Sequence, residues 1–296
     1  MVLLQQIFNG ITLGSLYALI AIGYTMVYGI LRLINFAHGD VFMWAGYWIF
    51  FLVLLFRLPW WAGAVLSVIL TAGMGWAIER IAYRPLREAP RISLLITAIG
   101  MSFLLEHIII VLPWATGIQK PYPRPQFMAR IFQLGQVRVQ AVTVWVPLIA
   151  IACLLGLLFL LYRTKVGRGM RAIATDIEAT EIMGADSNRI ISYTFVVGSA
   201  LAAVGGILWG CRYPALTYDM GVIPGWRAFT AAVVGGIGNV TGAMVGGFVL
   251  GLAEILFVAF LPGLSGYRDA FIFGILILFL MFRPTGILGR PLKEKV

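Results

Sequence analysis

Apolar stretches that are nearly free of charge follow one another along most of this chain. A helix rises about 1.5 Å per residue, so crossing a hydrocarbon core of about 30 Å takes about 20 apolar residues. Only 11% of the 296 residues are charged, whereas a soluble domain carries about 25%. The sequence therefore predicts an integral membrane protein with an all-α fold, a polytopic transmembrane bundle forming one domain over residues 1–296. The clear candidate spans are residues 8–30, 41–56, 60–78, 92–112, 141–162 and 191–210.

Three weaker apolar segments follow, at residues 228–238, 243–261 and 270–282. The first and the last are short for a full crossing. Short segments interrupted by glycine at membrane depth are typical of broken or re-entrant helices that line a cavity. We therefore expect eight or nine spans, with at least one of them interrupted.

The distribution of Lys and Arg predicts the orientation of the chain. If Arg32, the loops 79–91 and 163–190 and the C-terminal tail are cytoplasmic, that side carries 14 basic residues and the opposite side, which includes the loop 113–140, carries 8. Cytoplasmic loops of membrane proteins are enriched in Lys and Arg, so we expect a cytoplasmic C-terminus. Nine crossings would place the N-terminus outside, and a re-entrant segment would change that count. The same bias accounts for the net charge of +10 without a nucleic acid partner.

The usual sequence signatures of catalysis are missing. The chain contains no G-x-x-x-x-G-K-[ST], H-E-x-x-H, G-x-S-x-G or C-x-x-C pattern. His38 and His107 are far apart in sequence, with no cluster of other metal ligands around them. Cys153 and Cys211 lie in or beside apolar stretches, where thiols behave as small hydrophobic groups. We therefore expect a conduit rather than an enzyme, with no cofactor and no metal.

Four ionisable residues fall within or beside the apolar spans, namely Asp40, Glu106, His107 and Glu254. Such residues are costly in a membrane and are functional candidates by default. Glu106 and His107 are neighbours, and neighbours diverge by about 100° around a helix, so they cannot both face one small site. We expect one of them to pair with a neighbouring helix. Glu254 could face a cavity, although an interhelical hydrogen bond is the simpler expectation.

The stretch 32–40 predicts a break between the first two helices. It carries Asn35 at a plausible N-cap position and a glycine just before the second apolar helix. One interpretation is an unwound hinge whose polar groups face a translocation path. The other is a tight cytoplasmic turn with a capping Asn and a solvated Asp40.

A second glycine-rich stretch, 234–247, resembles the first. Its glycines at 238, 242 and 246 would share one helix face, where backbones can approach closely. Asn239 and Thr241 have the character of a cap at a helix break. One such break in each half of the chain suggests an internal repeat of the kind found in transporters.

The two longest loops differ in character. Residues 170–183 of the inner loop lack Gly and Pro and predict a short amphipathic helix. Its apolar face would carry Ala172, Ile173, Ile177, Thr180 and Met183. The outer loop contains a proline-rich run at 120–125, which favours extended backbone and could be a docking surface or a plain linker.

Several blocks together resemble the permease subunits of branched-chain amino acid ABC transporters, the LivH type. They are FNGITLGSLYAL at 8–19, GYTMVYG at 23–29, INFAHG at 34–39, ERIAYRP at 79–85, AFTAAVVGGIG at 228–238 and RPTGILG at 283–289. The blocks run in the family's order from the first span to the C-terminus. The resemblance implies the permease fold of an ABC importer in a bacterial inner membrane. It also implies two cytoplasmic ATPase subunits, a second and different permease subunit, and a periplasmic substrate-binding protein as partners.

The resemblance also implies a role for the inner loop. The segment 178–184 reads EATEIMG and is similar to the E-A-A-x-x-x-G coupling motif, with Thr180 where the second Ala usually stands. By this resemblance Asp176, Glu178, Ala179, Thr180 and Gly184 would couple the permease to an ATPase subunit. A rigid helix would carry the force, and Gly184 would allow the turn that ends it.

For the substrate, the resemblance implies leucine, isoleucine and valine, with looser members of the family carrying other neutral or polar amino acids, while related permeases carry urea or short amides. Our hypothesis is that Asn35, His38 and Asn239 line the path through their helix breaks, because the N-termini of half-helices favour a carboxylate. A proton- or sodium-coupled carrier, which would use Asp40, Glu106 or Glu254, is the alternative from another class. An intramembrane enzyme would need a catalytic cluster that the sequence does not offer.

Overall fold

The computed structural model describes residues 2–87, 89–112, 119–134 and 137–289. Within them the chain is almost entirely helical, and its strands are two to four residues long. The elements are α1 Val2–Leu31, α2 His38–Phe50, η1 Phe51–Leu55, α3 Trp60–Ile78, η2 Glu79–Tyr83, η3 Arg84–Leu86, α4 Arg91–Val111, β1 Lys120–Pro121, α5 Gln126–Ala129, β2 Ile131–Leu134, β3 Val137–Gln140, α6 Ala141–Arg163, α7 Lys165–Thr175, α8 Ile177–Ile182, α9 Ser187–Arg212, β4 Ala215–Leu216, α10 Val222–Gly235, α11 Val240–Phe260, η4 Pro262–Tyr267 and α12 Arg268–Phe282.

Eight helical segments in the described residues are long and apolar enough to cross a membrane. They contain α1, α2 with η1, α3 with η2 and η3, α4, α6, α9, α11, and η4 with α12. Helix α10 is also apolar but has only 14 residues. The expected polytopic bundle is therefore confirmed, with one short helix among the spans.

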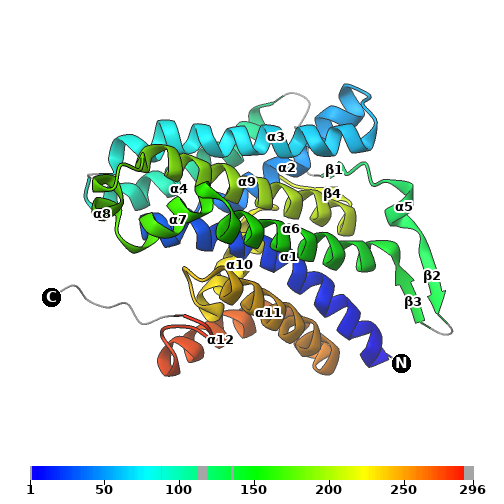
Figure 1. Ribbon diagram of the computed structural model, residues 1–296. Coiled ribbons are helices and arrows are strands. Elements are labelled where there is room, and N and C mark those ends of the chain that lie inside the picture. The colour runs from blue at the N-terminus through cyan, green and yellow to red at the C-terminus, as the bar shows by residue number, and fades with distance from the viewer. Residues whose placement is uncertain (1, 88, 113–118, 135–136, 290–296) are drawn as a thin grey trace.

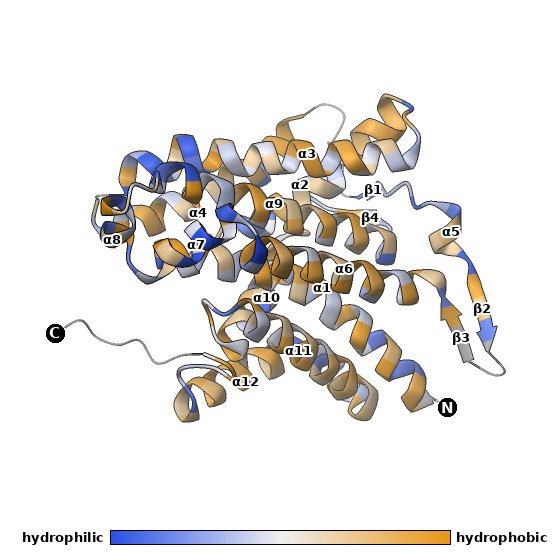
Figure 2. Cartoon of the chain, in the orientation of Figure 1, coloured by the Kyte–Doolittle hydropathy of each residue, from blue (hydrophilic) through white to orange (hydrophobic). Residues whose placement is uncertain are grey.

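The polar parts of the molecule gather at its two ends. The N-terminal end of α1 and the hairpin β2–β3 lie at one end, and α7, α8 and the α10–α11 connection lie at the other (Figure 1). Hydrophilic residues are frequent around α7 and α8, whereas the long helices are mostly hydrophobic (Figure 2). We call these the hairpin end (β2–β3) and the α8 end.

Helix α1 forms the centre of the bundle and packs against α6, α9, α10 and α11. Its contact with α11 is made backbone to backbone. A Cβ added at Gly251 would lie 2.3 Å from the backbone nitrogen of Gly14, and one added at Gly247 would lie 2.6 Å from the Cα of Ala18. Small residues allow this approach, which lets two helices pack tightly where no hydrophobic effect drives them together.

Helix α10 enters the bundle through a non-helical segment, 213–221, that follows α9. It spans Val222–Gly235, so it begins six residues before the start of the predicted segment 228–238 and ends three residues before the end of that segment. It ends at Gly236, whose φ is +112°. Of the three glycines predicted to share a packing face, Gly242 and Gly246 do contact α10, but Gly238 lies in the turn with a φ of +93° and no neighbouring atom within 4 Å of an added Cβ.

The outer loop is tied to the bundle by its first half. Strand β1 pairs antiparallel with β4, and β2 pairs antiparallel with β3. Tyr122, next to β1, is buried and donates a hydrogen bond to the carbonyl of Ile207 in α9 at 3.0 Å. Burial raises the pKa of the Tyr122 phenol well above its ordinary value, so the group stays neutral. Residues 113–118 and 135–136 of the predicted loop lie outside the described residues.

Candidate functional site

A cavity of about 310 Å³ lies where α1, α2, α4 and α10 meet. That volume falls in the range of about 300–1,000 Å³ found for small-molecule sites. Phe103 of α4 and Trp226 of α10 line it and are themselves 58% and 44% exposed, so the cavity opens between these two helices. Its lining is Tyr24, Ile34, Phe36, Gly39, Asp40, Ile99, Ser102, Phe103, Glu106, Gly221, Val222, Gly225, Trp226 and Phe229.

Two helix N-termini meet at this cavity. Helix α2 begins at His38 and α10 begins at Val222. Gly39 and Gly221 bring them together, because a Cβ added at Gly39 would lie 2.6 Å from the carbonyl oxygen of Gly221. No side chain fits between the two backbones. The break predicted at 32–40 is therefore present, and Ile34, Phe36, Gly39 and Asp40 of this stretch line the cavity.

Asp40 and Glu106 are the two carboxylates of the cavity, and the structure brings them together from α2 and α4. Asp40 is 1% exposed, and its Oδ2 accepts a hydrogen bond from the hydroxyl of Ser102 in α4. Its Oδ1 has no hydrogen-bond partner among the residues that the structure describes. Glu106 lies one helical turn after Ser102 and is partly exposed. His107 is exposed and contacts the Phe103 carbonyl of its own helix at 2.8 Å.

Asn35 and His38 belong to the same break, but neither is among the residues that line the cavity. The side-chain oxygen of Asn35 accepts a hydrogen bond from the Tyr83 hydroxyl at 2.8 Å, and its backbone carbonyl accepts one from the His38 N–H at 3.1 Å. The N-cap of α2 is Ala37, so the predicted capping role of Asn35 is wrong. The imidazole of His38 is buried against Tyr24, with ring centroids 4.8 Å apart.

Asn239 lies at the α8 end, in the turn between α10 and α11. Its side-chain oxygen accepts hydrogen bonds from the N–H groups of Thr241 and Gly242 at 3.1 and 3.2 Å, which makes it the N-cap of α11. Its amide donates to the carbonyl of Leu288 at 2.7 Å. The structure thus brings Asn35 and His38 into one turn, but Asn239 into another. The three lie outside the set of described residues that line the cavity.

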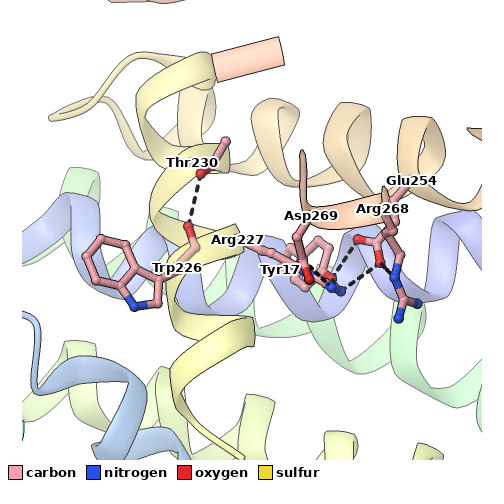
Figure 3. A network of polar contacts seen from close by, with 7 residues as sticks. All are labelled: Tyr17, Trp226, Arg227, Thr230, Glu254, Arg268 and Asp269. Atoms are coloured by element: carbon pink, nitrogen blue, oxygen red, sulfur yellow. Dashed lines mark hydrogen bonds and ion pairs between the residues drawn. The ribbon is translucent and has the colours of Figure 1, made fainter. Parts of the chain in front are cut away.

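Glu254 belongs to a buried network on the other side of α10. One carboxylate oxygen accepts from Arg227 at 2.7 Å, and the other accepts from the Tyr17 hydroxyl at 2.7 Å. Arg227 also binds Asp269, and Arg268 approaches Glu254 at 3.5 Å. These side chains come from α1, α10, α11 and α12 and point toward one another, whereas Trp226 points the opposite way (Figure 3). Glu254 therefore makes the interhelical hydrogen bond that was the simpler expectation.

The charged loop at the α8 end forms two helices rather than one. The predicted helix 170–183 is broken at Asp176, whose side-chain oxygen accepts from the N–H of Ala179 at 3.1 Å and so caps α8. Of the predicted apolar face, Ile173 and Thr180 are buried, but Ala172, Ile177 and Met183 are exposed. Ile177 and Met183 follow the new helix start, which changes the direction of the chain, whereas Ala172 lies before it, in α7, whose buried residues are Gly167, Met170 and Ile173.

The segment 178–184 stands at the surface of that end. Glu178 and Ala179 are exposed, while Thr180 is 8% exposed and turns toward the bundle. Gly184 has a φ of +84°, as expected for the residue that ends α8. The neighbouring Ala185 N–H closes the turn on the Thr180 carbonyl at 3.2 Å. Ile182 and Met183, 86% and 85% exposed, form an apolar tip beside the turn.

The sequence reasoning missed Ser102 and Arg227. Ser102 stands four residues before Glu106, so the two share a helix face, and that spacing could have indicated it. Arg227 precedes the predicted short span directly. A cation at the edge of an apolar segment could have been read as the partner of an intramembrane carboxylate.

A bundle of apolar helices around a small cavity that holds two carboxyl groups, with a charged helical hairpin at one end, is typical of a membrane transport protein. Residues 6–280 match the family described as the branched-chain amino acid transport system / permease component, and the chain belongs to this family. Its members are transport subunits, not enzymes.

Relatives match over nearly the whole length. BraD of Pseudomonas aeruginosa, a high-affinity branched-chain amino acid transport system permease protein, is 44% identical, and the match covers 99% of this chain and 98% of BraD. LivH of Escherichia coli K12, with the same description, is 42% identical, covering 99% of this chain and 97% of LivH. A probable LivH of the archaeon Methanocaldococcus jannaschii is 27% identical over 97% of this chain and 92% of its own length.

Proposed function

We propose that this permease moves branched-chain amino acids across a bacterial inner membrane as one subunit of an ATP-driven ABC importer. The observation that carries the proposal is identity of 42–44% over nearly the whole chain with two permeases described as high-affinity branched-chain amino acid transporters. The cavity between α1, α2, α4 and α10 is the part of the path that this chain supplies. Its apolar wall suits an aliphatic side chain better than urea or a short amide.

The partners follow from the same proposal. Two ATPase subunits would lie in the cytoplasm, a second and different permease subunit would complete the path, and a periplasmic protein would deliver the solute. The α8 end would then face the cytoplasm, together with the C-terminus. Its exposed segment 178–184 offers the ATPase a rigid helix between two capped ends. Glu178, Ala179 and Gly184 face outward there, while Asp176 and Thr180 hold the segment in place.

The test is uptake by the complete complex in vesicles. Radiolabelled leucine should accumulate only with internal ATP and the binding protein, and unlabelled isoleucine and valine should compete, while urea and acetamide should not. Accumulation by this chain alone without nucleotide would contradict the proposal. So would uptake that stops when an uncoupler removes the proton gradient, which is the behaviour of an ion-coupled carrier.

A further inference from the structure

We infer that Asp40 and Glu106 bind the ammonium group of the amino acid as it passes through the cavity. This inference rests on the proposed function and adds the chemistry by which the permease holds its solute. It begins from Asp40, a residue of the cavity lining whose Oδ1 is buried and has no hydrogen-bond partner among the described residues. A buried carboxylate oxygen without a partner is costly, so a donor from a bound solute would satisfy it.

The chain itself offers no cation for this role in the described part of the bundle. Arg227 is the basic residue of α10, the helix that forms one cavity wall. Its guanidinium is engaged with Glu254, Asp269 and Tyr17 on the opposite side of that helix (Figure 3). The side chain that does bind Asp40 is Ser102, whose neutral hydroxyl donates a hydrogen bond to Oδ2. The Oδ1 of Asp40 is thus left to a donor from a ligand.

Glu106 extends the same negative surface to the mouth of the cavity. It lies one turn from Ser102 on α4 and is partly exposed at the depth of a membrane span. A carboxylate in that position is expected to face water or protein rather than lipid. The opening between α4 and α10 is therefore the side on which the path continues, where a second permease subunit would stand.

The rest of the lining selects among cations. Ile34, Ile99 and Phe229 form apolar walls around the two carboxylates, and Phe36 packs on Trp226 with ring centroids 5.2 Å apart. A small inorganic ion would leave these walls without a partner. A primary ammonium that carries an aliphatic side chain satisfies both the acidic and the apolar surface. That is the chemistry of a zwitterionic amino acid such as leucine.

The experiment compares variants of the complete complex in vesicles, with two readouts. Asp40→Asn should lower ATP-driven leucine uptake at least tenfold, while ATP hydrolysis stimulated by the binding protein persists. Asp40→Glu should recover part of the uptake because it keeps the charge. Glu106 lies at the partly exposed mouth of the cavity, so Glu106→Gln should have a smaller effect and raise the leucine concentration needed for half-maximal uptake several-fold. His107→Gln is the matched control, since His107 lies beside Glu106 on α4 but faces away, and its uptake should equal that of the wild type.

Each other outcome has a defined meaning. Wild-type uptake in both Asp40→Asn and Glu106→Gln overturns the inference and leaves the proposed function standing. Loss of uptake together with loss of stimulated ATP hydrolysis in both variants gives these residues a structural role and also overturns it. Uptake that needs sodium or a proton gradient overturns it as well, because the carboxylates would then serve a coupling ion. A wild-type complex that takes up no branched-chain amino acid overturns the proposed function itself.

Discussion

At the scale of single residues, the buried charges divide into two groups with opposite roles. Asp40 has one carboxylate oxygen without a partner among the described residues, whereas both oxygens of Glu254 are engaged. The first arrangement leaves an oxygen free for a ligand, and the second holds helices together. The distinction depends on contacts between residues far apart in sequence, so the sequence alone favoured an interhelical hydrogen bond for Glu254 but left two interpretations open for Asp40.

Arg227→Met should destabilise the bundle strongly. It leaves Glu254, which is 1% exposed, without its main counter-charge, and breaking a buried pair in this way costs about 3–5 kcal/mol. Arg268→Gln is the matched control, because Arg268 is 47% exposed and approaches Glu254 only at 3.5 Å, where an ion pair contributes about 0–1 kcal/mol. The measurement is the midpoint of thermal unfolding in detergent. Adding Glu254→Gln to Arg227→Met should recover part of the loss, and equal effects of the two arginine variants would contradict the role of the network.

At the scale of helices, the apolar tip of α8 makes a prediction that belongs to the proposed coupling. Ile182 is 86% exposed outside the membrane-spanning helices, and burying such a side chain in a groove contributes about 1.5–3 kcal/mol. Ile182→Asp should therefore weaken retention of the ATPase subunits on the permease and lower uptake about tenfold or more, since a factor of ten corresponds to about 1.4 kcal/mol. Retention is measured by co-purification.

Thr175→Ala provides the matched control for this change. Thr175 is also exposed on the hairpin, but among the described residues its hydroxyl bonds only to the Arg171 carbonyl of its own helix, at 3.0 Å. It should leave both co-purification and uptake unchanged. If Ile182→Asp behaves in the same way, the tip does not contact the ATPase.

Helix bounds show what local sequence can and cannot predict. Helix α3 begins at Trp60 as predicted, because Pro59 marks its start locally, but the helical span continues past Ile78 through η2 and η3 to Leu86. Helix α10 begins earlier than predicted, because Arg227 is accommodated within it by Glu254 and Asp269, which lie 27 and 42 residues further along the chain. The break at Asp176 had a local signal, since Asp is a preferred N-cap residue. The absence of Gly and Pro from 170–183 was nevertheless not enough to predict an unbroken helix.

The candidate site was predictable only in part. Asp40 and Glu106 could be selected as costly charges in apolar spans, and both line the cavity. Asn35 and His38 sit in the predicted hinge, yet their side chains turn to Tyr83 and Tyr24. The direction of a side chain next to a helix break depends on backbone angles that no simple period describes. The suggested internal repeat stays a prediction.

At the scale of the whole molecule, the two ends should lie on opposite sides of the membrane. One of the eight basic residues assigned to the outer side is Arg227, which is buried in α10. The excess of exposed basic residues on the inner side is therefore larger than the loop counts indicated. The predicted tail charges Arg290, Lys293 and Lys295 lie outside the described residues. The orientation itself is a prediction that rests on the charge bias.

Cysteine labelling checks this orientation. Phe132→Cys, at the exposed hairpin end, should react with a membrane-impermeant maleimide in intact spheroplasts, whereas Met183→Cys, at the α8 end, should react only after permeabilisation. The parent chain controls for Cys153 and Cys211, which are partly and fully buried. The reverse pattern would invert the assignment, and labelling of both from one side would contradict the arrangement in Figure 1.

Two helices that line the cavity, α10 and α4, differ in how firmly they are packed against the rest of the bundle. Helix α10 is fastened to α1, α11 and α12 by the charges around Arg227, but α4 packs mainly on α2 and η2. It is joined to α2 by the Ser102–Asp40 bond and by a bond from the Trp44 indole to the Leu105 carbonyl at 2.9 Å. We therefore expect α4 to be the cavity wall that moves when the complex changes between its inward-facing and outward-facing conformations. Displacement of α4 would break the hydrogen bond between Ser102 and Asp40 and would disturb a solute bound to Asp40. The same movement would therefore open the passage and release the solute.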